Sequence, residues 1–161
     1  NLLAYAAMSE GRHVTFLPAY GVEMRGGTAN CTVVISSKSI GSPVVGRPTS
    51  VIIMNLPSLV KYQDRIKPNG LLILNSSLVD PGELTRKDIE CVTVPFNAIA
   101  AQNGSDRLAN MVALGVYLEK TSIVRQKSIE EAFSRVLDER HHPMIPANIK
   151  AIKKGRGFLK R

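Results

Sequence analysis

Residues 51–75, VIIMNLPSLVKYQDRIKPNGLLILN, decide the fold class of this chain. The stretch begins with the apolar run Val51-Ile52-Ile53-Met54, in a strand predicted over residues 51–56, and ends with the apolar run Leu71-Leu72-Ile73-Leu74, in a strand predicted over residues 71–75. Such runs are typical of strands that are covered on both faces of a parallel sheet. Residues 57–66 fit a helix that starts at a proline, and a Pro-Asn-Gly turn at residues 68–70 ends it. Strand, helix and strand in this order indicate an α/β fold with a mostly parallel sheet.

The segments on either side extend this pattern. Helix formers fill residues 1–8, and further short strands are predicted at residues 13–18, 30–36 and 91–94. After these strands, the spacing of the apolar residues changes from every second residue, which is typical of strands, to every 3.6 residues, which is typical of helices. A helix opens at Asp106, and Ser128 with Glu131 forms a capping-box pattern at the start of a second helix.

We therefore predict a single domain over residues 1–161. Its fold class is α/β, a Rossmann-like three-layer domain with a mostly parallel sheet flanked by helices and a helical C-terminal region. In such sheets ligands gather at the carboxyl ends of the strands.

Composition and charge exclude several classes of protein. The chain is 44% hydrophobic and 21% charged, as ordinary globular domains are, and its longest apolar runs are far too short to cross a bilayer. Six of the basic residues behind the net charge of +8 fall within residues 150–161, which contain no acidic residue. No tryptophan is present and aromatic residues do not interleave with this basic segment, so we expect a solvated face or a docking strip there rather than a nucleic-acid or membrane partner.

The two cysteines, Cys31 and Cys91, are sixty positions apart. This spacing offers no paired thiols for zinc or an iron–sulfur cluster, so we expect this chain alone to hold no redox centre. Each cysteine lies in an apolar, strand-like context, which predicts a buried small hydrophobic residue. Sparse cysteine fits a reducing cytoplasm.

The loop after the first predicted strand is the strongest candidate for a binding site. It runs Tyr20-Gly21-Val22-Glu23-Met24-Arg25-Gly26-Gly27. An arginine beside paired glycines places a cation next to backbone that can approach a ligand closely, which suits a phosphate or a carboxylate. The equally weighted alternative is a structural crossover in which Glu23 and Arg25 serve a subunit interface or each other.

Other candidates are weaker. Asn75 and Ser76 end the apolar strand at residues 71–75, where α/β sheets place ligand contacts, although such residues also make ordinary turns. The adjacent His141 and His142 have no acidic or thiol companion nearby and fit a surface turn. Without a P-loop, a Rossmann glycine fingerprint or a Ser-His-Asp order, we assign no catalytic residue and no metal site to this chain.

Residues 17–30, LPAYGVEMRGGTAN, resemble the signature of gamma subunits of 2-oxoacid:ferredoxin oxidoreductases, in the branch that acts on 2-oxoglutarate or branched-chain 2-oxoacids. Segments at residues 40–43, 55–59, 75–77 and 110–115 match the family in the same order. Members usually have a strand and a glycine-rich turn ahead of the helix that here covers residues 1–8, so we expect that portion to lie outside this sequence. Val22 and Ala19 replace the Pro and Ser that are common in relatives.

The resemblance implies a division of labour. Alpha, beta and ferredoxin-like delta partner subunits would carry thiamine diphosphate and [4Fe-4S] clusters, coenzyme A would be the co-substrate, and ferredoxin the electron acceptor. Under this hypothesis Tyr20, Gly21, Glu23, Met24, Arg25, Gly26, Gly27, Asn75 and Ser76 contact coenzyme A or a partner subunit. A purely structural assembly subunit and a stand-alone nucleotide-binding protein are the alternatives. The isolated chain could also form a homodimer through apolar surface meant for partners.

Overall fold

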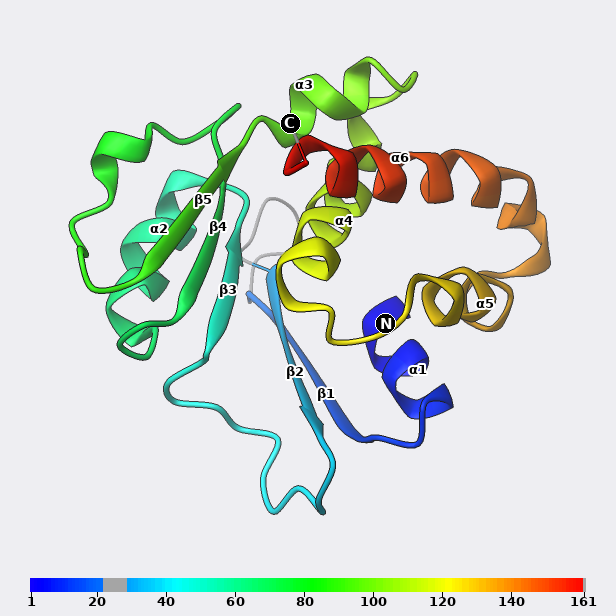
Figure 1. The fold of residues 1–161 in the computed structure, drawn as a ribbon, viewed down its shortest axis with the longest axis horizontal. Helices are drawn as coiled ribbons and strands as arrows, with labels where there is room; N and C mark the ends of the chain where they lie inside the picture. The colour runs from blue at the N-terminus through cyan, green and yellow to red at the C-terminus, as the bar shows by residue number, and fades with distance from the viewer. Residues whose placement is uncertain (22–28, 161) are drawn as a thin grey trace. The chain divides into compact units, whose positions relative to one another are not determined.

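The computed structural model describes residues 1–21 and 29–160, and the chain divides into two compact units (Figure 1). The first comprises residues 1–45 and 123–142, and the second comprises residues 46–122 and 143–161. The expectation of a single domain stays a prediction.

The second unit contains the parallel sheet. Its strands are β3 (Ser50–Ile53), β4 (Leu71–Asn75) and β5 (Glu90–Val94), arranged in the order β3-β4-β5 with both pairs parallel. Every residue of the central strand β4 is buried, and the apolar run Leu71 to Leu74 predicts this for its first four residues. The α/β fold class is confirmed.

Helices cover both faces of this sheet, because alternate residues of β4 point in opposite directions. Leu72 and Leu74 pack in a cluster with Leu59 of helix α2 (Leu56–Tyr62). On the other face Leu71 and Ile73 pack in a second cluster with residues of the helices α3 (Phe96–Ala101), α4 (Ala109–Thr121) and α6 (Ile145–Phe158).

The strand predicted at residues 51–56 is shorter than expected. β3 ends at Ile53, because Asn55 already caps α2: its Oδ1 accepts a hydrogen bond from the Ser58 amide at 3.0 Å. Pro57 lies in the first turn of α2, as predicted. Short 3₁₀ segments follow α2 and occur elsewhere, at Gln63–Arg65, Pro81–Glu83, Asp106–Leu108 and Glu139–Met144.

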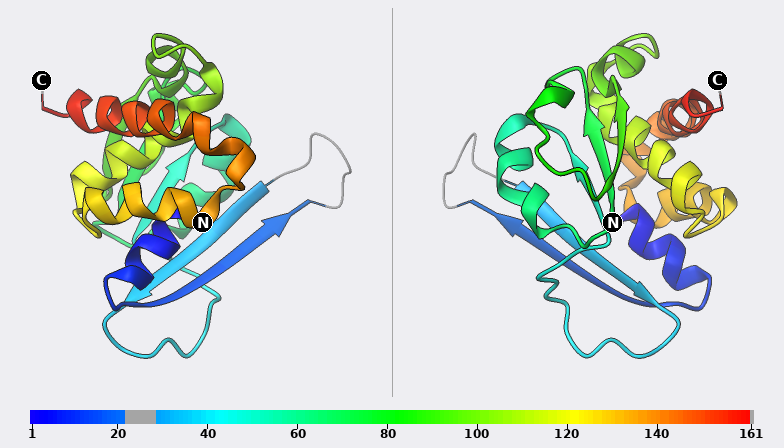
Figure 2. Two further views of the ribbon diagram at one scale, coloured as in Figure 1. Left: turned by 90° about the vertical axis from the view of Figure 1, so that its right-hand side faces the viewer. Right: turned by 60° about the vertical axis from the view of Figure 1, so that its left-hand side comes forward.

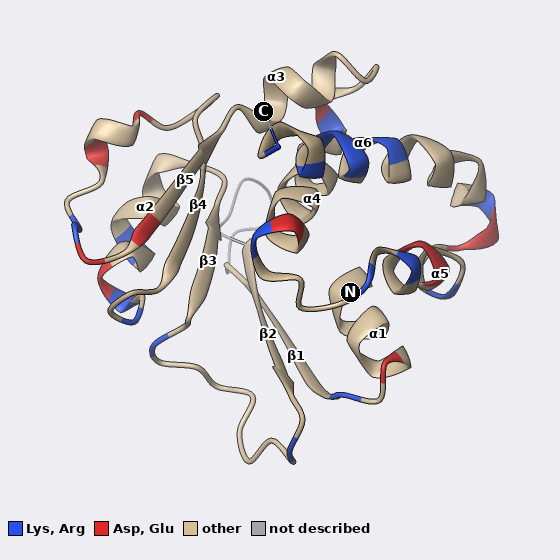
Figure 3. Cartoon of the chain, in the orientation of Figure 1, with Lys and Arg blue, Asp and Glu red and all other residues tan. Residues whose placement is uncertain are grey.

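The helices α4 and α6 cross at two glycines. A Cβ atom at Gly115 would lie 2.0 Å from the carbonyl oxygen of Ile152, and one at Gly155 would lie 2.1 Å from the carbonyl oxygen of Val112. Both distances are far below van der Waals contact, so only glycine fits at either position. α6 is also the helix formed by the basic C-terminal segment, and Figure 3 shows Lys and Arg along it.

The first unit contains a two-stranded antiparallel hairpin, β1 (His13–Tyr20) and β2 (Ala29–Ser36), and the helices α1 (Leu2–Ser9) and α5 (Gln126–Val136). The two strands run side by side in Figure 2. β1 extends beyond the strand predicted at residues 13–18 and reaches Tyr20, so the prediction that Tyr20 belongs to the following loop is wrong.

One buried-cysteine prediction is wrong. Cys31 is exposed, because β2 pairs only with β1 in the part of the chain described and a two-stranded hairpin covers little of its own surface. Cys91 on β5 is half-buried, and this burial raises the pKa of its thiol.

The capping-box prediction at Ser128 is also wrong, although the helix that it predicted exists. α5 begins at Gln126, which places Ser128 inside the helix. Its hydroxyl donates to Oε1 of Glu10 at 2.6 Å, and the same oxygen accepts from the Arg125 backbone amide at 2.7 Å and from Arg125 Nε at 3.3 Å. Glu10, just after α1, therefore accepts the hydrogen bonds at the N-terminus of α5, although it is at least 115 residues away in the sequence.

The Glu10 contacts make the stability of the chain pH-dependent. The hydrogen bond from Ser128, followed by those from Arg125, holds the pKa of Glu10 below its usual value of about 4.3. A carboxyl group whose pKa is lower in the folded than in the unfolded state stabilises the fold at every pH above its unfolded-state pKa. This contribution is lost as the pH falls through the folded-state pKa. We expect Glu10→Gln to lower the free energy of unfolding by about 1 kcal/mol at pH 7, and the difference from wild type to shrink below about pH 4.

Urea unfolding curves at pH 7 and pH 3.5 measure this effect. Glu131→Gln, on the exposed side of α5, is the matched control and should change little at either pH. A Glu10→Gln deficit that is equal at both pH values would contradict the prediction.

Candidate functional site

The candidate site is the carboxyl edge of the parallel sheet, and Asn75 organises it. Asn75 is the last residue of β4 and is completely buried. Its Nδ2 donates to the carbonyl oxygen of Met54, which follows β3, at 3.3 Å, and to Oδ1 of Asn97 at 2.8 Å. Its Oδ1 accepts from the backbone amides of Phe96 at 3.1 Å and Ser77 at 3.2 Å.

These four bonds use both amide protons and both lone pairs of the Asn75 side chain. The residue therefore links the ends of all three strands: Met54 follows β3, Ser77 follows β4, and Phe96 and Asn97 follow β5. A direct contact with a ligand would require Asn75 to give up one of these bonds. The arrangement makes Asn75 a positioning residue, and its predicted ligand contact stays a prediction.

Ser76 and Ser77 present the polar groups of this edge. Ser76 is exposed, and its backbone amide donates to the carbonyl oxygen of Val94 at 3.0 Å. Ser77 is half-buried, and its Oγ accepts from the Ala98 amide at 3.4 Å. Ser76 therefore has a side chain at the surface on a backbone that is held in place, as a ligand contact at a strand end needs.

Sequence reasoning missed Asn97 at this edge. The residue follows β5 just as Asn75 ends β4, so a polar residue after the strand at residues 91–94 was the available signal. Its side chain holds Asn75 in place.

The second predicted part of the site belongs to the other unit. Tyr20 is the last residue of β1 and is 79% exposed, and Gly21 follows it. Glu23, Met24, Arg25, Gly26 and Gly27 lie outside the described residues. The two parts of the predicted site thus remain separate predictions.

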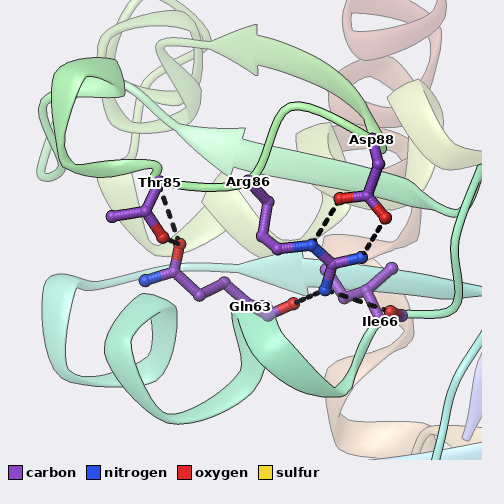
Figure 4. Close-up of polar contacts among 5 residues, drawn as sticks. All are labelled: Gln63, Ile66, Thr85, Arg86 and Asp88. Carbon is purple, nitrogen blue, oxygen red and sulfur yellow. Dashed lines mark hydrogen bonds and ion pairs between the residues drawn. The ribbon is translucent and has the colours of Figure 1, made fainter.

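The loop that begins at Ser76 is anchored at its far end, where Figure 4 shows the contacts. Arg86 makes a bidentate ion pair with Asp88, with Nε–Oδ1 at 2.5 Å and Nη2–Oδ2 at 2.6 Å. Its Nη1 donates to the carbonyl oxygens of Gln63 at 3.0 Å and Ile66 at 3.3 Å, at the end of the α2 region. The hydrogen bond with Asp88 raises the pKa of Arg86 and lowers that of Asp88.

Gln63 completes this anchor, and its replacement tests it. The buried side-chain Oε1 accepts from the Thr85 amide and the Thr85 hydroxyl, both at 3.1 Å. We expect Gln63→Leu to destabilise the chain by about 1–3 kcal/mol. Leucine is similar in size to glutamine but has no oxygen, so the Thr85 amide loses its hydrogen-bond acceptor. Thermal melting measures the loss; Gln102→Leu, at an exposed position just after α3, is the control, and equal melting temperatures for the two variants would refute the role of Gln63.

Charged side chains beside the sheet are paired across elements. Lys120 of α4 pairs with Glu90 of β5, and Glu119 of α4 pairs with Arg156 at 2.8 Å and Lys160 at 3.5 Å. The Arg156 hydrogen bond is the main cause that lowers the pKa of Glu119. These pairs tie part of the basic segment to α4.

The described residues offer no ligand set for a metal ion. Within residues 1–21 and 29–160, no three His, Cys, Asp or Glu side chains gather closely enough to hold one. His142 lies in the 3₁₀ segment Glu139–Met144 and its Nε2 is 3.1 Å from the carbonyl oxygen of Leu137. In the same part of the chain, no helix has the length and apolar character that a membrane span needs.

Comparison with known proteins agrees with this architecture. The family described as pyruvate ferredoxin/flavodoxin oxidoreductase matches residues 1–158. The ketoisovalerate oxidoreductase subunit VorA of Methanothermobacter marburgensis is 39% identical over 116 residues, which are 72% of this chain and 24% of VorA. The chain thus spans about a quarter of the length of that relative.

Relatives of similar size also match. The 2-oxoglutarate synthase subunit KorC of Methanocaldococcus jannaschii is 30% identical over 151 residues, which are 93% of this chain and 79% of KorC. The crystal structure of a keto/oxoacid ferredoxin oxidoreductase gamma subunit from Geobacter sulfurreducens superimposes with a TM-score of 0.80 at 26% identity, covering 99% of this chain and 89% of that one.

Part of a longer chain has the same fold. A 2-oxoglutarate:ferredoxin oxidoreductase from Magnetococcus marinus superimposes with a TM-score of 0.85 at 21% identity, over 99% of this chain and 28% of that one. The resemblance to gamma subunits that residues 17–30 carry is confirmed, and the chain belongs to the pyruvate ferredoxin/flavodoxin oxidoreductase family.

Proposed function

We propose that this chain is the gamma subunit, or gamma-type domain, of a cytoplasmic 2-oxoacid:ferredoxin oxidoreductase. The observation that carries the proposal is the match to nearly four-fifths of KorC, a named subunit of 2-oxoglutarate synthase. The complex would convert a 2-oxoacid, either 2-oxoglutarate or a branched-chain 2-oxoacid, and coenzyme A to acyl-CoA and CO₂. Its electrons would pass to ferredoxin.

In this proposal the chain itself carries no redox cofactor. Thiamine diphosphate and [4Fe-4S] clusters would belong to alpha, beta and ferredoxin-like delta subunits, which supply the chemistry of decarboxylation and electron transfer. This chain would contribute binding and orientation of coenzyme A through Arg25 and its neighbours and through Ser76, with Asn75 holding the strand ends in place.

Reconstitution tests the function. The chain is co-expressed with the companion subunits encoded beside it, and the purified assembly is assayed for coenzyme A-dependent reduction of ferredoxin with several 2-oxoacids. Activity that is lost when this chain is omitted, and restored when it is added back, is the expected result. Full activity without it would overturn the proposal.

A purely structural subunit is the alternative, and Arg25→Ala separates the two within the active assembly. A role in coenzyme A binding predicts a raised KM for coenzyme A with normal assembly. Arg12→Ala, which removes an exposed arginine from the start of the hairpin, is the matched control. Unchanged coenzyme A kinetics for Arg25→Ala would favour the structural alternative.

A further inference from the structure

The orientation of the Asn97 side chain is fixed by its bond to Asn75. Asn75 itself has one possible orientation, because its Oδ1 accepts from two backbone amides and its Nδ2 donates to the carbonyl oxygen of Met54. The same Nδ2 also donates to Asn97 at 2.8 Å. Only an oxygen can accept this bond, so Asn97 presents Oδ1 to Asn75 and directs its own Nδ2 away from it.

The Nδ2 of Asn97 is a donor without a partner at the candidate site. In the part of the chain that the structure describes, no hydrogen bond uses this nitrogen, and Thr15 Oγ1 is the one buried side-chain polar atom that lacks a partner. The nitrogen is therefore accessible, although Asn97 as a whole is half-buried. Because Asn75 holds the other end of the amide, the free N–H groups keep a fixed direction. Binding sites use preorganised donors of this kind to orient a ligand.

Ser77 adds a second neutral donor beside Asn97. The Ala98 amide donates to Ser77 Oγ at 3.4 Å, so this hydroxyl lies next to the segment that carries Asn97. The oxygen accepts that bond, and its hydroxyl proton is available to another acceptor. The adjacent Ser76 is exposed. The edge thus offers amide and hydroxyl protons, which suit a ligand that presents oxygen acceptors.

The absence of charge at this edge distinguishes between two kinds of oxygen acceptor. Residues 54–58, 75–79 and 95–99, which follow the three strands, include no Asp, Glu, Lys, Arg or His. Two apolar residues of these segments, Leu56 and Leu78, are exposed. All of these residues belong to the second compact unit. Phosphates are usually bound by Arg or Lys, whereas neutral donors beside apolar side chains suit an uncharged carbonyl group.

We infer that Asn97 Nδ2 donates a hydrogen bond to an amide carbonyl in the pantetheine arm of coenzyme A. This inference rests on the proposed function and specifies which part of the ligand the carboxyl edge of the sheet binds. The pantetheine arm is uncharged and combines amide groups with apolar carbons, whereas the nucleotide end carries the phosphates. The neutral donors and the exposed leucines of the edge match the arm.

Asn97→Asp isolates this hydrogen bond. Aspartate keeps an oxygen that accepts from Asn75 but replaces the nitrogen donor with a second oxygen, so the fold keeps its link and the ligand loses its bond. We expect the melting temperature to stay within about 2 °C of wild type. In the assembled complex, the inhibition constant of S-methylpantetheine against coenzyme A should rise by about tenfold. This probe is uncharged, so the added carboxylate does not repel it as it would repel a phosphate.

A second ligand fragment and a control variant separate the possible causes. Inhibition by adenosine 3′,5′-bisphosphate, which corresponds to the nucleotide end, should change by less than about twofold. Gln102→Glu makes the same amide-to-carboxylate change at an exposed position just after α3, and it should alter neither inhibition constant. An unchanged constant for S-methylpantetheine in Asn97→Asp, or an equal rise for the bisphosphate, would overturn the inference.

A second variant decides if melting curves show that Asn97→Asp does not fold. Asn97→Gln keeps the amide and its neutrality but displaces it by one methylene group, so it should also weaken inhibition by S-methylpantetheine. Inhibition equal to that of wild type would overturn the inference.

The outcome is separable from that of the proposed function. Omission of the wild-type chain tests the function and involves no variant. An assembly that needs this chain for coenzyme A-dependent ferredoxin reduction, but in which Asn97→Asp binds S-methylpantetheine as wild type does, rejects the inference alone. An assembly that is fully active without this chain rejects the proposed function.

Discussion

We expect Gly155→Ala to lower the free energy of unfolding by about 3 kcal/mol or more. The new Cβ would lie 2.1 Å from the Val112 carbonyl oxygen, 2.9 Å from its carbonyl carbon and 3.1 Å from the Val116 nitrogen. All three are backbone atoms of α4, so no side chain can rotate away. The two helices must separate, and the cluster that includes Val112, Val116 and Ala151 loses its packing.

Chemical denaturation of the purified chain measures this loss, and α6 supplies its own control. Gly157 lies two residues further along the same helix, where an added Cβ would meet no atom of another described element within 4 Å. Gly157→Ala should therefore stabilise the helix by about 0.5–1 kcal/mol, since alanine is the better helix former. A Gly155→Ala variant as stable as Gly157→Ala would contradict the close crossing of α4 and α6.

The sequence could predict one half of that crossing. Gly115 stands in a helical apolar pattern, which favours close packing. Gly155 stands among lysines and arginines, where its neighbours suggest a solvated helix and no contact. Which helix packs against α6 depends on tertiary structure, and the spacing of apolar residues along α6 does not predict it.

The same distinction explains the other differences. β4 was predictable because its first four residues, Leu71 to Leu74, form a continuous apolar run, as is typical of a strand that is covered on both faces. The hydrogen-bond partner of Ser128 could not be predicted, because Glu10 is 118 positions away in the sequence. The capping-box pattern of Ser128 and Glu131 is also the same whether Ser128 precedes the helix or lies inside it. Cys31 has an apolar context, but its exposure depends on how many strands join the sheet.

The candidate site shows the limit for polar residues. Asn75 and Ser76 were placed at the carboxyl edge by the strand rule alone. That rule gives the position but not the role: Asn75 is buried with four hydrogen bonds, whereas Ser76 is exposed. Asn97 shares the edge and supplies one of those bonds.

Asn75→Ala is expected to destabilise the chain by about 3 kcal/mol or more. The substitution leaves the buried Phe96 amide without its acceptor and the Met54 carbonyl without its donor, and each unsatisfied group costs about 1–3 kcal/mol. Because these groups follow β5 and β3, the ends of the three strands lose their common link. Under the proposed function, the assembled oxidoreductase should then lose activity because the strand ends are displaced and not because a ligand contact is missing.

Ser76→Ala separates those two causes, because Ser76 is adjacent to Asn75 but exposed. It should change the stability by less than about 0.5 kcal/mol, as surface substitutions do. If the Ser76 hydroxyl contacts coenzyme A, the variant raises the KM for coenzyme A in the complex while its melting temperature stays that of wild type. Normal kinetics for Ser76→Ala together with an unstable Asn75→Ala would mean that this edge holds the sheet together and binds no coenzyme A. Wild-type stability of Asn75→Ala would instead refute the positioning role that its four hydrogen bonds assign to it.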